Sequence, residues 1–191
     1  MGQYYKLITL SSQKTKNPKK MIKGWMDSFD YDSGSKLLEF SYVGNNFVNA
    51  FASLLSHTKR GIKVVCAGDY ADNENDEETK NLYDYTSECP NKHILPKNGM
   101  NIKKTYRYLI NTDKKQFVDV EKVKRNTSGY KLHPLPLLIA EGNGRGGGDY
   151  HAENPDFYKV GIWARDHIRV SDHKPLNKEY TELEVGFFED F

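Results

Sequence analysis

The sequence predicts an α+β protein, with one amphipathic helix packed on a mainly antiparallel sheet in a single domain, residues 1–191. Strand-like segments are numerous, whereas one segment has a clear helical pattern and no strand–helix–strand unit repeats. Aromatic residues make up 13% of the chain, including 13 tyrosines and 9 phenylalanines, which favours β-structure. A chain of 191 residues is long enough for one sizeable core and short for two.

The predicted helix opens at Gly44-Asn45-Asn46, where an asparagine provides the N-cap. Apolar residues then recur at helical spacing on one face, which predicts that this face lies against the core. His57, near the end of the segment, is placed to interact with the helix dipole. The apolar face consists of Phe47, Ala50, Phe51, Leu54 and Leu55.

Strands are expected where apolar and aromatic residues alternate or run together between turn-forming residues. Residues 25–35 are predicted to be an irregular or exposed connection, and residues 72–100 a long surface loop rich in turn signals. The predicted strands are residues 4–10, 37–42, 62–68, 135–140, 158–164 with an extension over 168–170, and 183–187, together with a hairpin of 106–111 and 116–120.

Charge is unevenly distributed, although the formal net charge is only +2. Lysines gather in an early basic run and residues 69–88 are strongly acidic, and such runs are usually solvated faces. The basic run has no interleaved aromatic platform before Trp25, so we do not favour nucleic acid as a partner. The basic run consists of Lys14, Lys16, Lys19, Lys20 and Lys23.

The sequence carries no sign of a membrane or a secreted protein. No apolar run approaches the length of a membrane span, and the N-terminus lacks the apolar stretch of a secretion signal. Cys66 and Cys89 fit a reducing compartment and lack the C-x-x-C spacing of zinc or redox centres. We therefore expect a cytoplasmic protein with no membrane partner.

A glycine-rich segment is the first candidate ligand site. Five of the fifteen glycines lie within residues 142–148, and successive main-chain N–H groups around glycines form concave nests for anions, which Arg145 would close. Tyr150 would stack on a base. Alternatively, the glycines only allow a tight corner and Arg145 pairs with Glu141 or Asp149. The predicted ligand-binding residues here are Asn143, Gly144, Arg145, Gly146, Gly147, Asp149 and Tyr150.

The glycine spacing also matches the G-x-G-x-x-G pattern of dinucleotide folds. That pattern needs a helix after the loop, and residues 149–157 contain Pro155 and no helical period, so a dinucleotide fold is not favoured. Asp149, His151 and Glu153 alternate and would share one face of an extended segment as weak metal candidates. No second group of ligands accompanies them, so we assign no metal site and no cofactor.

Charged residues at the ends of predicted strands form the second candidate site. Asp69 and Asp72 directly follow the apolar segment 62–68, where they either bind a ligand or cap a turn. Arg165 follows the predicted strand 158–164 and either pairs with Asp166 or contributes a cation to the same pocket. His133, next to two prolines, either points into the site or packs inside the protein.

Six segments together carry a resemblance: Met1 to Tyr5, Gly44-Asn45, Ala67 to Asp72, Leu135 to Leu137, Glu141 to Tyr150 and Trp163 to Asp166. They resemble a family of small proteins of bacteriophages and bacteria for which no activity is established. The resemblance extends over most of the chain and carries over no catalytic role. It implies a small phage-related accessory protein that acts on host machinery or host defence, in the host-cell cytoplasm.

Three functions follow from these observations. The first is binding of a small anionic, nucleotide-derived ligand through the glycine-rich segment, by which a phage protein would sequester a host defence signal. The second is inhibition of a host defence protein by direct contact through the basic run or the acidic segment. The third is metal-dependent hydrolysis, as by a phosphodiesterase, using Asp69, Asp72, Asp149 and His151. Catalysis ranks last, and no catalytic residue is assigned.

Overall fold

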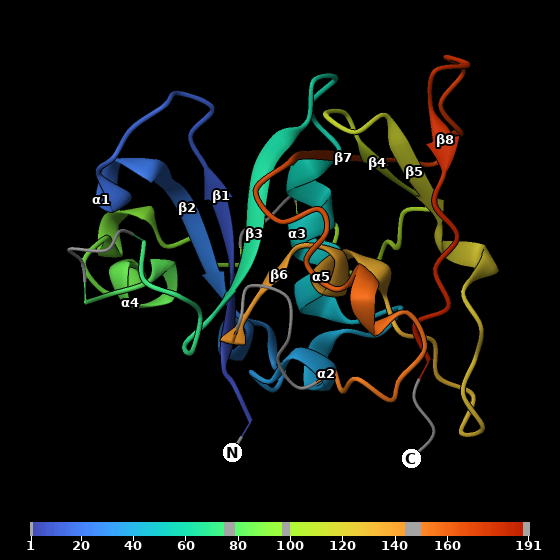
Figure 1. Cartoon of the computed structure of the whole chain (residues 1–191), viewed down its shortest axis with the longest axis horizontal. Helices are drawn as coiled ribbons and strands as arrows, with labels where there is room; N and C mark the ends of the chain where they lie inside the picture. The colour runs from blue at the N-terminus through green and yellow to red at the C-terminus, as the bar shows by residue number, and fades with distance from the viewer. Residues whose placement is uncertain (1, 75–78, 97–99, 144–149, 189–191) are drawn as a thin grey trace.

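The computed structural model describes residues 2–74, 79–96, 100–143 and 150–188. Within these ranges, eight strands form an open, mostly antiparallel sheet in the order β2-β1-β3-β7-β4-β5-β8, and β6 pairs in parallel with β3 (Figure 1). The α+β class and the antiparallel sheet are thus confirmed. The strands are β1 (Tyr5–Leu10), β2 (Ile22–Asp27), β3 (Ile62–Gly68), β4 (Tyr108–Asn111), β5 (Gln116–Asp119), β6 (Ala140–Glu141), β7 (His167–Ser171) and β8 (Thr181–Glu182).

The longest helix is the one that the sequence predicts. It begins after Asn45, whose Oδ1 accepts hydrogen bonds from the N–H groups of Phe47 (2.9 Å) and Val48 (3.2 Å). Four shorter helices accompany it in the described residues, so the expectation of a single packed helix is not confirmed; none of the helices described is long and apolar enough to cross a membrane. The helices are α1 (Pro18–Met21), α2 (Leu37–Phe40), α3 (Asn46–Leu55), α4 (Leu82–Thr86) and α5 (Pro134–Leu138).

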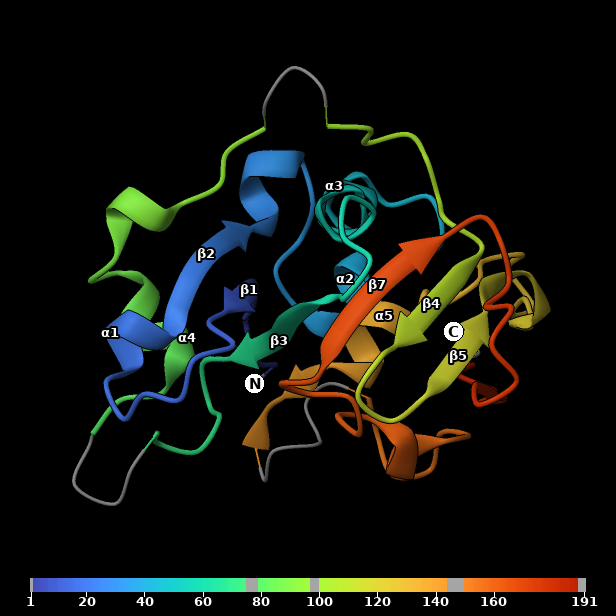
Figure 2. The same cartoon turned by 90° about the horizontal axis from the view of Figure 1, so that it is seen from above.

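Helices cover both faces of the sheet. Successive side chains of a strand point to opposite faces, so Val64 and Cys66 of β3 pack in the main core with α3 and α5. Val65 and Ala67 point the other way, into a smaller cluster with Leu82 of α4. Figures 1 and 2 show α3 and α5 on one side of the sheet and α1 and α4 on the other.

Two apolar segments that were predicted as strands are helices. Residues 37–42 contain α2, in which Leu37 and Phe40 are buried and Glu39 Oε2 accepts a hydrogen bond from the Lys36 N–H (3.0 Å). Residues 135–140 contain α5 and only then β6. His133 is the N-cap of α5, because its Nδ1 accepts a hydrogen bond from the Leu135 N–H (3.2 Å). Neither segment therefore contributes the long strand that its apolar run indicated.

Four further expectations differ from the structure in the described residues. Residues 25–35 begin with the second half of β2, and Trp25 is buried rather than exposed. Residues 158–164 form turns that begin with a 3₁₀ helix, Phe157–Lys159, whereas the predicted extension 168–170 is confirmed as part of β7. Near the C-terminus the strand is β8, which precedes the predicted range 183–187. Within the predicted surface loop 72–100, α4 buries Leu82 against the sheet.

The strands at residues 5–10 and 62–68 and the β4–β5 hairpin are confirmed. β3 is central to the site because two strands share one of its edges. β7 pairs with the first half of β3, at Ile62 and Lys63, and β6 pairs with the second half, at Cys66 and Ala67. The end of β6 and the start of β7 are therefore held along the same edge of β3.

Candidate functional site

The acidic and glycine-rich segments leave the sheet side by side. β3 and β6 are parallel, and Ala67 lies opposite Glu141 in their register. The acidic segment follows β3 and the glycine-rich segment follows β6, so both start at the same end of neighbouring strands. The centre of the predicted anion site lies outside the described residues, so it stays a prediction; it comprises Gly144, Arg145, Gly146, Gly147 and Asp149.

Arg165 joins the two segments through a buried ion-pair network. Its Nε and Nη2 donate to the Glu141 carboxylate at 2.7 and 2.8 Å. Its Nη1 and Nη2 also donate to Glu74 at 2.9 and 2.6 Å. The side chains of Arg165, Glu141 and Glu74 are 24%, 6% and 3% exposed. The Arg165 guanidinium thus holds Glu74 of the acidic segment close to Glu141 of β6.

The backbone places Arg165 between β6 and β7. Its N–H donates to the Val64 carbonyl (2.8 Å), and the Val64 N–H donates to the Asp166 carbonyl (3.1 Å). Arg165 has a φ of 64°, the left-handed conformation that disfavours a residue with a Cβ. Burial alone lowers the pKa of the guanidinium, but the hydrogen bonds with Glu74 and Glu141 more than offset this and raise its pKa. Arg165 is therefore a permanent cation.

This geometry differs from both roles considered for Arg165. It pairs with Glu141 and Glu74 rather than with Asp166, which accepts hydrogen bonds from Asn111 Nδ2 (2.8 Å) and Lys114 Nζ. Two carboxylates already surround the guanidinium, so Arg165 offers no uncompensated charge to an anion. Glu141 pairs with Arg165. Arg145, which one alternative paired with Glu141, lies outside the described residues.

The other predicted site residues do not converge on this network. Asp69 Oδ1 accepts a hydrogen bond from the Tyr4 N–H (3.1 Å), which ties the end of β3 to the start of the chain. Asp72 and Asn143 are exposed. The exposed residues His151 and Glu153 belong to no metal-ligand group, since no three histidine, cysteine, aspartate or glutamate side chains gather suitably within the described ranges. Their proposed partner Asp149 lies outside those ranges.

Tyr150 has a supporting role instead of the predicted stacking role. It is fully buried, and its ring packs edge-on against Phe187 at a centroid distance of 5.6 Å. Its hydroxyl donates to the carbonyl of Pro155, and it accepts a hydrogen bond from the Phe188 N–H (3.1 Å). A ring enclosed in this way cannot stack on a ligand, but it fixes the position of Phe187 and Phe188.

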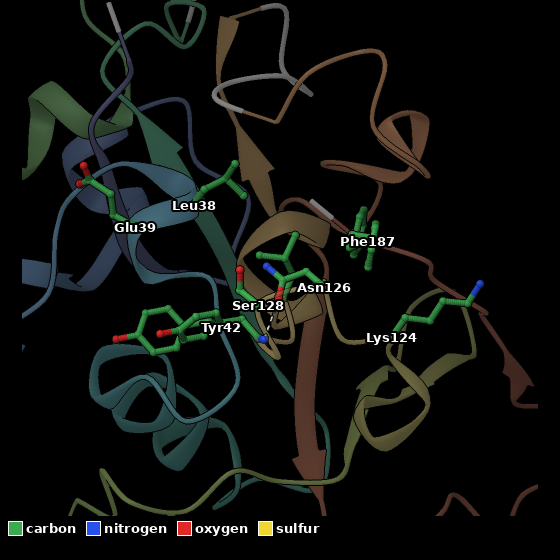
Figure 3. A pocket seen from close by; sticks show the side chains of 10 residues that line it. Leu38, Glu39, Tyr42, Lys124, Asn126, Ser128 and Phe187 are labelled. Carbon is green, nitrogen blue, oxygen red and sulfur yellow. Dashed lines mark hydrogen bonds between the residues drawn. The ribbon is translucent and has the colours of Figure 1, made fainter. Parts of the chain in front are cut away.

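Phe187 and Phe188 help to form a cavity of about 380 Å³, here called the aromatic pocket. This volume lies within the usual range for small-molecule sites, which are mainly apolar with a few polar groups. Figure 3 shows Asn126 and Ser128 between Leu38 of α2 and Phe187 of the C-terminal segment. The aromatic pocket is lined by Leu38, Glu39, Tyr42, Lys124, Asn126, Ser128, Tyr130, Leu132, Phe187 and Phe188.

Main-chain hydrogen bonds hold the wall of the aromatic pocket in place. The residues after α2 pair with residues 131–133, since the Val43 N–H donates to the Lys131 carbonyl (2.9 Å) and the His133 N–H donates to the Ser41 carbonyl (3.0 Å). The preceding loop closes on Asn126, whose Oδ1 accepts from the Tyr130 N–H (2.7 Å). The wall is thus preformed by hydrogen bonds.

The polar groups of the aromatic pocket are few and distinct. Tyr42 and Tyr130 are 36% and 63% exposed, so their rings are accessible at its mouth. In the part of the chain that the structure describes, the Lys124 ammonium makes no ion pair and Asn126 Nδ2 donates no hydrogen bond. The pocket therefore offers aromatic surface, an amide donor and one cation to a ligand.

Sequence reasoning missed this pocket because its lining comes from three distant segments. Residues 38–42, 124–132 and 187–188 each contain one or two aromatic residues and no motif. The remaining signal is the polar turn that precedes Tyr130, an aromatic residue that none of the predicted strands includes. Comparisons with protein-family models, with curated proteins and with solved structures found no match to this chain.

Proposed function

We propose that this protein binds a small, anionic, nucleotide-derived ligand, and that the aromatic pocket receives its base. The observation that carries the proposal is the combination of accessible tyrosine rings with an unused amide donor in a preformed cavity of about 380 Å³. Aromatic side chains stack on any nucleobase, at about 1–3 kcal/mol per base. An amide donor next to a ring can donate a hydrogen bond to an acceptor atom on the edge of the stacked base.

The charges around the pocket are compatible with an anionic group outside it. Lys124 at the rim is available for a phosphate. Glu39 is the acidic residue of the lining, and Lys36 engages it through both its N–H (3.0 Å) and its Nζ (3.8 Å). The base would lie between the tyrosines, and the phosphate would extend toward Lys124.

The resemblance to phage proteins supports an accessory role. A ligand-binding protein without turnover would sequester a nucleotide signal of host defence. The glycine-rich segment belongs to the same proposal, because Tyr150 at its end fixes the Phe187 and Phe188 wall. We propose no catalytic step, since the pocket lining holds one carboxylate and no nucleophile activated by a base.

Isothermal titration with mononucleotides, triphosphates and cyclic dinucleotides tests the proposal. At least one should bind with one-to-one stoichiometry, and Tyr130→Ala should weaken it by roughly 5- to 150-fold, as loss of one stacking partner implies. Phe29→Ala is the matched control, because Phe29 is 69% exposed and lies outside the pocket. Absence of heat with every nucleotide, or equal affinity of Tyr130→Ala and the wild type, would overturn the proposal.

A further inference from the structure

A second pocket, here called the basic pocket, lies beside the edge strand β2, where the loop after β1 meets α1. Its volume is about 420 Å³, and none of its lining residues is acidic or aromatic. Figure 1 shows α1 and β2 at the far side of the sheet from β5 and β8. The lining residues are Ser11, Gln13, Lys14, Thr15, Lys20, Lys23 and Lys92.

Lys92 is a positioned cation in this pocket. Its Nζ donates to the carbonyls of Lys19 (2.6 Å) and Ile22 (2.8 Å). These carbonyls satisfy hydrogen bonds but carry no net charge, so the ammonium is held in place without being neutralised. One Nζ hydrogen remains to donate to a ligand.

The other lysines of the pocket are also uncompensated. Within residues 2–74, 79–96, 100–143 and 150–188, no carboxylate pairs with Lys14, Lys20 or Lys23. Glu88 lies on the neighbouring surface, but Lys19 and Lys80 both contact it at 2.5 Å. Their hydrogen bonds lower the pKa of the Glu88 carboxyl to about 2, so its charge is already matched by two lysines.

Two hydroxyl groups add neutral donors. Ser11 Oγ accepts a hydrogen bond from the Gln13 N–H (3.2 Å), and Thr15 Oγ1 accepts one from the Asn17 N–H (3.1 Å). A hydroxyl oxygen that accepts in this way leaves its O–H free to donate. The pocket thus offers four ammonium groups and two hydroxyl donors with no negative group, which is a donor set for phosphate oxygens.

We propose that the basic pocket binds a compact, multiply charged phosphate anion, such as the diphosphate or triphosphate part of a small molecule. Four like charges around one concavity repel one another, and an anion with several charged oxygens would relieve that repulsion. Because no lining residue is aromatic, the pocket provides no surface on which the bases of a nucleic acid strand would stack. This site is independent of the aromatic pocket, which takes a base.

Titration of the full chain with sodium tripolyphosphate at physiological salt tests this inference. Tripolyphosphate should bind with one-to-one stoichiometry, and Lys20→Gln/Lys23→Gln should weaken it at least tenfold. The matched control is Lys103→Gln/Lys178→Gln, which removes the same charge from exposed lysines outside the pocket. The Tyr130→Ala protein should bind tripolyphosphate as the wild type does, which separates this site from the proposed nucleotide site.

Three outcomes would overturn the inference. The first is absence of saturable binding of tripolyphosphate. The second is an equal loss in both double variants, which would indicate a general charge effect. The third is binding of single-stranded oligonucleotides that strengthens with their length while tripolyphosphate does not saturate, because this would indicate an extended nucleic-acid surface.

Discussion

Removing the Arg165 guanidinium should destabilise the protein severely. The substitution Arg165→Met keeps much of the side-chain volume but eliminates four hydrogen bonds of 2.6–2.9 Å and the positive charge. Glu141 and Glu74, 6% and 3% exposed, would then lose the guanidinium that pairs with both of them. Breaking a buried ion pair from one side costs about 3–5 kcal/mol. We expect a loss of that size in the free energy of unfolding.

Urea unfolding at pH 7, followed by the fluorescence of the buried Trp163, measures this loss. A protein of this size should unfold at a urea concentration lower by about 1.5–2.5 M. Lys104→Met is the control, since Lys104 pairs with Asp172 and the two side chains are 38% and 46% exposed. Water screens such a pair, so the urea midpoint should shift much less than in Arg165→Met.

Two further variants separate charge from packing. Adding Glu141→Gln to Arg165→Met removes one of the two buried negative charges that lose the guanidinium, so the double variant should be more stable than Arg165→Met alone. Arg165→Gly should be more stable than Arg165→Ala by about 1 kcal/mol, because glycine tolerates a φ of 64°. An Arg165→Met protein within about 1 kcal/mol of the wild type would refute the network as a source of stability.

Three more predictions concern single contacts. Burial lowers the pKa of His133 to about 3, so the unfolded chain binds more protons between that pH and about 6.5, and stability should fall there by about 1.4 kcal/mol per pH unit of acidification. His133→Asn keeps an N-cap acceptor but has no group that titrates in this range, so the urea midpoint should change less with pH than in the wild type. An equal change of the midpoint with pH in both proteins would contradict this. Asn45→Ala should cost about 1–2 kcal/mol, measured by urea unfolding, because α3 loses its cap; an unchanged midpoint would argue against that role. Tyr150→Phe should cost about 1–3 kcal/mol by the same assay and weaken nucleotide binding, because the partly buried Phe188 N–H loses its acceptor; an unaltered affinity for the nucleotide would show that Tyr150 does not support the aromatic pocket.

Segments with a strong local pattern were predictable from the sequence. α3 has an asparagine cap and an apolar face, and β3 has an apolar run bounded by glycines, so each pattern agrees with the packing. The run 135–140 has no such period. Pro134 and Pro136 fall in the first turn of α5, where N–H groups have no helical partner, so they permit the helix. The two prolines were therefore the feature of the sequence that argued against a strand at residues 135–140.

The candidate sites were harder to predict because topology, rather than local sequence, assembles them. Arg165 is adjacent to Asp166 in the sequence, which favoured an ion pair between these two residues. Its actual partners lie 24 and 91 residues away, at Glu141 and Glu74. They meet because β6 and β7 share one edge of β3, and the left-handed backbone at Arg165 turns the chain between them. A positive φ at a residue other than glycine costs conformational free energy, which the contacts of that residue must offset. At Arg165 the two buried carboxylates provide those contacts.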